Sequence, residues 1–169
     1  EAEASLRKTI ELKPDFEKAL STLGVILLDV GKFKEAESLM RKAIEINPNV
    51  AETYSDLGRI MIERGKLQEA EIFIRKAIKL KPDLAIAHAN LGGILREYGQ
   101  LEEAEMSALK AISIHPSWEA YFAYASCLYE KNEFKSCLES LYKAKTYVDQ
   151  KLSLLMLDAS IASVESSKN

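Results

Sequence analysis

Residues 51–84 read AETYSDLGRIMIERGKLQEAEIFIRKAIKLKPDL, and the chain on either side largely repeats this stretch. The four prolines of the chain lie 34 residues apart, at Pro14, Pro48, Pro82 and Pro116. Two glycine series keep the same interval, namely Gly24, Gly58 and Gly92, and Gly31, Gly65 and Gly99. Only Gly93 lies outside this pattern. A fixed period of this length indicates an array of structural repeats.

Each period predicts two α-helices joined by a tight turn. In residues 17–50, apolar residues such as Leu20, Leu23 and Leu27 recur at three- and four-residue steps, which marks one face of a helix. Gly31 is expected to end this helix, because glycine adopts the left-handed conformation of a helix C-terminus. A second helical pattern follows and ends before Pro48, which cannot continue a helix.

These patterns predict one all-α domain built as a solenoid. We expect its parts to be the second half of a truncated repeat at 1–16, repeats at 17–50, 51–84 and 85–117, a degenerate repeat at 118–149, and a capping helix at 150–166, within a single domain of residues 1–169. The degenerate repeat begins one residue early, and Asn132 stands where the other repeats have a turn glycine. Asparagine tolerates the left-handed conformation, so the turn is expected to persist. Because the chain begins within a repeat, we interpret it as a fragment of a longer protein.

Two expectations concern packing. Gly24, Gly58 and Gly92 fall in the middle of helices, where glycine costs about 1 kcal/mol relative to alanine. We expect them to allow close helix approach against Ala36, Ala70 and Ala104. In the capping helix, we expect Leu152, Leu155, Ala159 and Ala162 to face the last repeat, with Asp158, Ser160 and Ser163 facing water.

Composition excludes several classes of function. The chain is 47% hydrophobic and 29% charged, with a net charge of -3, so no basic field favours nucleic acid. No apolar run approaches the roughly 18–20 residues that span a bilayer, and we expect a cytoplasmic protein with no membrane partner. Cys127 and Cys137 are interpreted as reduced, buried thiols of an intracellular protein, with a disulfide between them as the alternative.

No catalytic constellation is present in the sequence. His88 and His115 are the only histidines, and His88 falls in the helix-packing series, which favours a core residue over a ligand. No HExxH motif, glycine-rich phosphate loop or Ser/His/Asp arrangement occurs. Tyr121, Tyr124 and Tyr129 are interpreted as core residues rather than an aromatic cage. We therefore expect no enzyme, no catalytic residue, no metal site and no cofactor.

The run Leu23-Gly24-Leu27-Gly31-Phe33-Ala36-Met40-Ala43-Pro48 resembles the motif of the tetratricopeptide repeat (TPR) family. The resemblance covers roughly residues 1–149 and departs from the family pattern at His88 and Ala108. The middle repeats are also similar in style to the arrays of O-linked N-acetylglucosamine transferases, SPINDLY-type proteins and bacterial TPR proteins. The resemblance implies a right-handed superhelical solenoid whose first helices line a concave groove for a peptide or a partner helix.

The resemblance implies peptide-binding candidates on the first helix of each repeat. They are Lys18, Ser21, Thr22, Val25 and Asp29; Glu52, Ser55, Asp56, Arg59 and Glu63; Ile86, Ala89, Asn90, Gly93, Arg96 and Glu97; and Phe122, Ser126 and Tyr129. Gly93 either opens the groove floor beside Arg59 and Arg96 or is a tolerated surface glycine. Ser21 and Val25 replace the Lys and Asn of the family's chaperone-binding clamp, so that clamp is not expected. Of the asparagine ladder seen in transferase-type arrays, only Asn90 is present, with Thr22 and Asp56 at the matching positions.

The sequence thus predicts a non-catalytic interaction scaffold that binds a partner protein or peptide through Arg59, Arg96, Asn90 and nearby apolar patches. One alternative is the substrate-recognition arm of a larger enzyme, such as a glycosyltransferase. Another is a homo-oligomer formed through exposed solenoid ends, where Leu6 and Ile10 would lack a covering helix.

Overall fold

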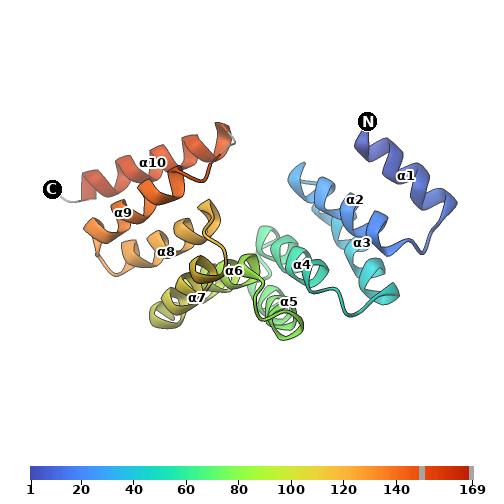
Figure 1. Ribbon diagram of the computed structural model, residues 1–169, viewed down its shortest axis with the longest axis horizontal. Coiled ribbons are helices and arrows are strands. Elements are labelled where there is room, and N and C mark those ends of the chain that lie inside the picture. Colours follow the sequence, from blue (N-terminus) through green and yellow to red (C-terminus); the bar gives the residue numbers. More distant parts are fainter. Residues whose placement is uncertain (149–150, 168–169) are drawn as a thin grey trace. The chain divides into compact units, whose positions relative to one another are not determined.

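The computed structural model describes residues 1–148 and 151–167, with the side chains of 151–153 left out. These residues form ten α-helices and no strand (Figure 1). The helices are α1 (Ala2–Leu12), α2 (Glu17–Asp29), α3 (Phe33–Ile46), α4 (Ala51–Glu63), α5 (Leu67–Leu80), α6 (Ala85–Glu97), α7 (Leu101–Ile114), α8 (Trp118–Glu130), α9 (Phe134–Lys145) and α10 (Lys151–Ser167).

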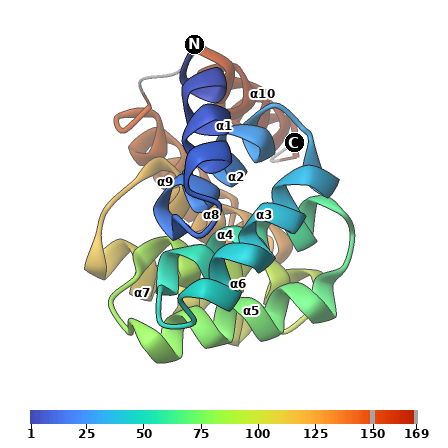
Figure 2. The same ribbon diagram turned by 90° about the vertical axis from the view of Figure 1, so that its right-hand side faces the viewer.

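The chain divides into two compact units, Glu1–Pro82 and Asp83–Asn169. In the first unit α2 packs on α3 and α4 packs on α5, as Figures 1 and 2 show, while α1 packs on α2 and α3 on α4. In the second unit α6 pairs with α7 and α8 with α9, and α10 packs on α9. First helices also touch within each unit, α2 with α4 and α6 with α8. Each unit is therefore a stack of helical hairpins.

The turns inside the hairpins follow the predicted chemistry. Gly31, Gly65 and Gly99 have φ values of 76, 70 and 72°, and Asn132 has a φ of 61°. After Asn132 the amide of Glu133 donates to the carbonyl of Leu128 over 2.9 Å, the same closure that Lys32 makes with Leu27 over 2.8 Å. This pattern satisfies carbonyls at a helix C-terminus. The prediction that Asn132 preserves the turn is confirmed.

The mid-helix glycines do allow close helix approach, but the opposing residues differ from those predicted. A Cβ at Gly24 would lie 2.8 Å from the Cε of Met40, and one at Gly58 would lie 2.5 Å from the Cδ1 of Ile74. In the third repeat Ala108 replaces the large residue, and a Cβ at Gly92 would lie 3.1 Å from the carbonyl oxygen of Ala104. The larger side chains of Met40 and Ile74 reach across first, so Ala36 and Ala70 are not the principal contacts.

The capping helix is present, but its inner face was predicted wrongly. Leu157, Ile161 and Val164 are buried among residues of α8 and α9, whereas Leu155 is 57% exposed. Ala159 and Ala162 are also exposed, and the side chain of Leu152 lies outside the described part. The apolar residues of α10 occupy two adjacent faces, and the bulky branched set packs inward because it buries more apolar area.

Candidate functional site

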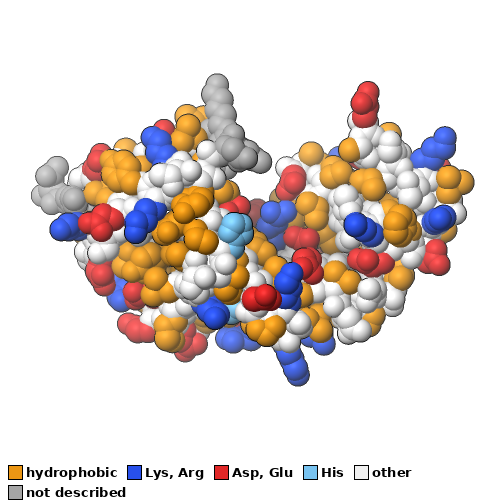
Figure 3. Space-filling view, viewed as in Figure 1, with side chains coloured by type: hydrophobic (Ala, Val, Ile, Leu, Met, Phe, Trp, Pro, Cys, Tyr) orange, Lys and Arg blue, Asp and Glu red, His pale blue; other side chains and the backbone are white. Residues whose placement is uncertain are grey.

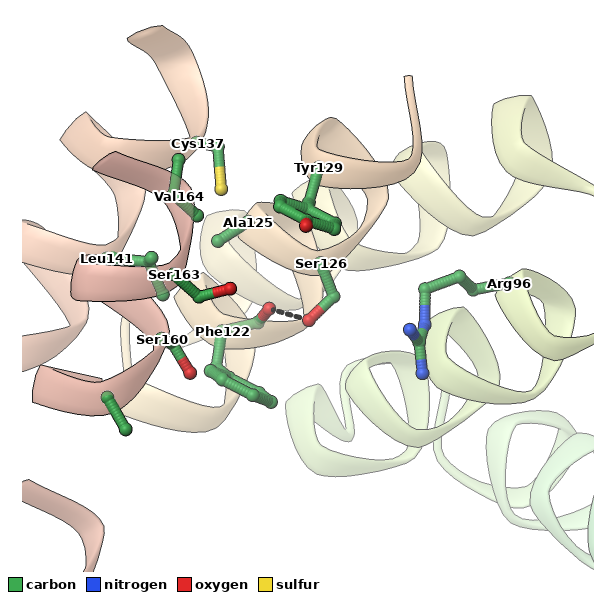
Figure 4. A pocket seen from close by; sticks show the side chains of 11 residues that line it. Arg96, Phe122, Ala125, Ser126, Tyr129, Cys137, Leu141, Ser160, Ser163 and Val164 are labelled. Atoms are coloured by element: carbon green, nitrogen blue, oxygen red, sulfur yellow. Dashed lines mark hydrogen bonds between the residues drawn. The ribbon is translucent and has the colours of Figure 1, made fainter. Parts of the chain in front are cut away.

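A pocket opens in the second unit between α8 and α10, and we call it the α8–α10 pocket (Figure 4). Its volume is about 350 Å³. Eleven residues from four helices line it: Arg96 of α6; Phe122, Ala125, Ser126 and Tyr129 of α8; Cys137 and Leu141 of α9; and Ala159, Ser160, Ser163 and Val164 of α10. Figure 4 shows α10 bounding one side and Arg96 reaching in from the other.

The floor of the α8–α10 pocket is part of the hydrophobic core. Ala125, Cys137, Leu141 and Val164 belong to one buried cluster, against which Phe122 packs. Tyr129 is 37% exposed and meets the ring of Phe134 edge-on at 5.8 Å between ring centroids. The interpretation of Tyr129 as a core residue is therefore wrong, because its ring forms a wall of the pocket.

Two serine hydroxyls at the pocket, those of Ser126 and Ser160, present acceptors. The hydroxyl of Ser126 donates to the carbonyl of Phe122 over 2.8 Å, and that of Ser160 donates to the carbonyl of Met156 over 2.9 Å. Each hydroxyl proton is thus engaged within its own helix, which leaves oxygen lone pairs free. The guanidinium of Arg96 pairs with Glu97 and lies 3.7 Å from Glu130, so its charge is partly neutralised within the unit.

A second concave region lies in the first unit between α2 and α4, and we call it the α2–α4 cleft. Its volume is about 440 Å³. The lining combines apolar, hydroxyl and charged side chains: Glu17, Lys18, Ser21, Thr22, Val25, Ile26, Val50, Glu52, Thr53 and Asp56. Six of these were predicted groove residues, and α2 and α4 bring them together.

Some charged groups in and around the α2–α4 cleft form ion pairs, whereas Asp56 forms none among the described residues. Lys81 bonds Glu52 at 2.8 Å and thereby lowers the pKa of that carboxyl. Arg59 pairs with Asp29 at 3.1 Å. Burial raises the pKa of Asp56 to about 6, and the carboxylates of Asp29 and Glu52 add to this rise, while Arg59 opposes it. Burial therefore disfavours the charged form of Asp56.

The remaining predicted groove residues lie outside both concave regions. Ser55 is 2% and Ala89 6% exposed, so neither side chain is available to a partner in this structure. Ala89 is covered because it packs against Ala111 and Ala120 of the following helices. The others are half-buried (Arg59, Ile86, Asn90, Gly93) or exposed (Asp29, Glu63, Glu97).

Two nitrogens among these predicted residues are buried and make no hydrogen bond. They are the Nε of Arg59 and the Nδ2 of Asn90. Buried donors in proteins are usually satisfied by protein groups or by ordered water.

Sequence reasoning missed Ala125 of α8 and every pocket residue contributed by α9 and α10. It also missed Glu17, Ile26, Val50 and Thr53 of the α2–α4 cleft. The repeat register places first-helix residues only. Since α10 has no counterpart in the other repeats, no signal in the sequence indicated that Ser160 and Ser163 would border a pocket.

The described residues contain no metal-ligand cluster, and both of their cysteines are unbonded. Within residues 1–148 and 151–167, no three His, Cys, Asp or Glu side chains are grouped so that they could hold a metal ion. Cys127 and Cys137 are buried and unbonded, as predicted, and burial raises the pKa of Cys127 to about 11. No described helix is long and apolar enough to cross a membrane.

Apolar side chains are unevenly distributed over the surface. Figure 3 shows hydrophobic side chains gathered over the part of the visible face that α8 to α10 form. Over α1 to α3, acidic and basic side chains are interleaved with smaller apolar areas. The α8–α10 side is thus the more apolar of the two surfaces in this view.

Comparison with known proteins agrees with the repeat pattern. Residues 15–83 match the family model of the tetratricopeptide repeat. No curated protein matches the sequence.

Solved structures resemble the chain over most of its length. A thermophilic TPR protein of Thermus thermophilus has a TM-score of 0.81 and 20% identity, covering 96% of this chain and 88% of that one. PilW, a widely conserved type IV pilus biogenesis factor, has a TM-score of 0.78 and 22% identity, covering 96% and 76%. YrrB, a TPR protein with an unusual peptide-binding site, has a TM-score of 0.63 and 20% identity, covering 93% and 81%. At such identities the likeness shows the fold alone, and the predicted all-α solenoid of helical hairpins is confirmed.

Proposed function

The chain belongs to the tetratricopeptide-repeat family, and from this premise we propose that it is a non-catalytic scaffold that binds a peptide or helical segment of a partner protein. The coarse assignment to protein interaction follows from the TPR fold. The choice of the α8–α10 pocket as the principal binding site is our own inference.

The α8–α10 pocket carries this proposal. Four predicted groove residues, Arg96, Phe122, Ser126 and Tyr129, line it together. Its volume of about 350 Å³ falls in the range of roughly 300–1,000 Å³ that is common for ligand sites. An apolar floor between two aromatic rings suits a large apolar side chain, and the serine oxygens suit backbone amides of the bound segment.

Gly93 does not line the pocket, but it supports binding along the same face of α6. It lies in α6 one turn before Arg96, so both residues share a face of the helix. A Cβ at Gly93 would meet nothing within 4 Å, in contrast to Gly24 and Gly58. Packing therefore does not explain why the helix bears the cost of a glycine there, about 1 kcal/mol. Room for the main chain of a bound segment would explain it.

The test is selection from a displayed library of random dodecapeptides. Ser163 is exposed on α10 and lines the pocket, so Ser163→Trp places an indole over the opening at little cost to the core. Ser166 is exposed on the same helix but does not line the pocket, which makes Ser166→Trp the matched control.

We expect the wild type and Ser166→Trp to enrich the same peptides, with large apolar residues among them, and Ser163→Trp to lose them. Circular dichroism of all three proteins verifies that the helices are intact. Equal enrichment by Ser163→Trp and the wild type would remove the α8–α10 pocket as the binding site.

A further inference from the structure

The walls of the α2–α4 cleft suit a long aliphatic stem. Val25 and Ile26 of α2 lie on one side, and Val50 lies at the start of α4 on the other. Lysine and arginine bury such stems against apolar surface while the charged end remains near polar groups. The shape of the cleft would accept any unbranched side chain. The polar groups of the lining therefore determine which of these side chains binds.

The two hydroxyls that α2 contributes to the cleft are already committed as donors. The Oγ of Ser21 donates to the carbonyl of Lys18 over 3.2 Å, and the Oγ1 of Thr22 donates to the same carbonyl over 2.7 Å. What these groups offer to a ligand is therefore oxygen lone pairs. A group that enters beside them has to donate hydrogen bonds.

The charges of the cleft also favour a ligand that donates hydrogen bonds, and one that is positively charged. The cleft is lined by three carboxylates, Glu17, Glu52 and Asp56, and by one ammonium group, Lys18. Lys81 engages Glu52, and Asp29 engages Arg59, the cation nearest to Asp56 along α4. Asp56 makes no ion pair within 4.0 Å with any residue of 1–148 or 154–167.

We infer that the α2–α4 cleft receives a lysine or arginine side chain of the partner segment, with Asp56 as its carboxylate partner. This inference rests on the proposed function and names a chemical feature of the partner. It concerns a different unit from the α8–α10 pocket, so the two sites can be altered separately.

The environment of Asp56 supports the inference. Burial, together with the charges of Asp29 and Glu52, raises the pKa of Asp56 against the opposing effect of Arg59. A carboxylate in this state gains more from a cation than an exposed one does, because less water competes for it. A bound metal ion is not the occupant we infer, since the described part of the chain groups no three ligands around one point.

The test compares peptide selection by the wild type, Asp56→Asn and Asp56→Lys from the same dodecapeptide library. Glu45→Gln, which removes an exposed carboxylate on α3, is the control. We expect the wild type and Glu45→Gln to enrich lysine or arginine at one position of the selected peptides. Asp56→Asn should lose that preference, and Asp56→Lys should replace it with aspartate or glutamate.

A double-mutant cycle then measures the pairing directly. Replacing the enriched lysine of one selected peptide by methionine should weaken its binding to the wild type at least about tenfold, and to Asp56→Asn much less. An equal loss on both proteins would overturn the inference even if Asp56→Lys fails to fold.

The outcomes separate the two proposals. Enrichment of peptides by the wild type without any preference for lysine or arginine overturns the inference and leaves the proposed function standing. Failure of the wild type to enrich any peptide overturns both.

Discussion

Glycines within the first helices of the repeats meet different demands. A Cβ added at Gly24 or Gly58 would lie 2.8 or 2.5 Å from a side chain of the paired helix, whereas one at Gly93 would face open space. Packing within the hairpin leaves little room for a side chain at the first two glycines. The third is free of that constraint, which is why its presence bears on binding.

We predict opposite effects of alanine at these glycines. Gly58→Ala should lower the free energy of unfolding by about 1 kcal/mol or more, because the new Cβ displaces Ile74. Gly93→Ala should raise it by about 0.5–1 kcal/mol through helix propensity alone. Urea denaturation followed by circular dichroism measures both. Destabilisation by Gly93→Ala would show that this glycine serves packing after all.

The raised pKa of Asp56 predicts that the stability of the folded protein depends on pH. Its folded pKa of about 6 lies above the unfolded value of about 3.9, so the folded carboxyl holds its proton more tightly. The contribution of Asp56 to the free energy of unfolding is therefore favourable at low pH and is lost as pH rises from about 4 to about 6. Asp56→Asn should stabilise the protein above pH 6 by on the order of 2 kcal/mol and should differ little from the wild type near pH 4.

Denaturation midpoints at a series of pH values test this difference, with Glu45→Gln as an exposed control on α3. A wild-type-to-Asp56→Asn difference that stays constant from pH 4 to pH 7 would contradict the assigned environment of Asp56. The groups that set this environment are Arg59 and Glu52 on α4 and Asp29 on α2.

Among the elements, the turn between α8 and α9 shows how the array tolerates divergence. Asn132 holds the left-handed conformation that glycine holds in the other turns. We predict that Asn132→Ala lowers the free energy of unfolding by about 1 kcal/mol, because alanine is strained at positive φ, and that Asn132→Gly does not lower it. Chemical denaturation of the two variants tests this prediction. Equal free energies of unfolding for Asn132→Ala and Asn132→Gly would mean that the turn relaxes to accommodate alanine.

The capping helix α10 gives a second comparison between neighbouring residues. Leu157 is fully buried and Leu155 is 57% exposed. Leu157→Ala should cost about 2–4 kcal/mol, whereas Leu155→Ala should stay within about 0.5 kcal/mol. A larger loss of stability for Leu155→Ala than for Leu157→Ala in a denaturation experiment would show that the face predicted from the sequence packs inward.

The difference between repeats and cap has a physical cause. In the repeats, the same apolar positions recur in register, so each copy supports the assignment of the others. In α10, Leu154, Leu155, Met156 and Leu157 are consecutive, and no copy of the helix exists to choose between its faces. Periodicity alone leaves such a helix ambiguous.

For the molecule as a whole, the 34-residue period was sufficient to predict the fold class and the helical hairpins. The period fixes where helices end, through Gly31 or Pro48 and their copies, and which residues form the core. The candidate site could be predicted only in part. Ala89 is buried because it packs against Ala111 of α7 and Ala120 of α8, and the α8–α10 pocket needs a helix outside the repeat pattern.

The proposed binding site lies where repeat and cap meet, in the second unit, and the charged α2–α4 cleft lies in the first. We propose that a partner segment occupies the α8–α10 pocket. The most direct measurement is a fluorescence anisotropy titration of one selected peptide against the wild type, Ser163→Trp and Ser166→Trp. We predict equal dissociation constants for the wild type and Ser166→Trp, and a dissociation constant at least about tenfold higher for Ser163→Trp. Equal affinity of all three proteins would contradict the claim.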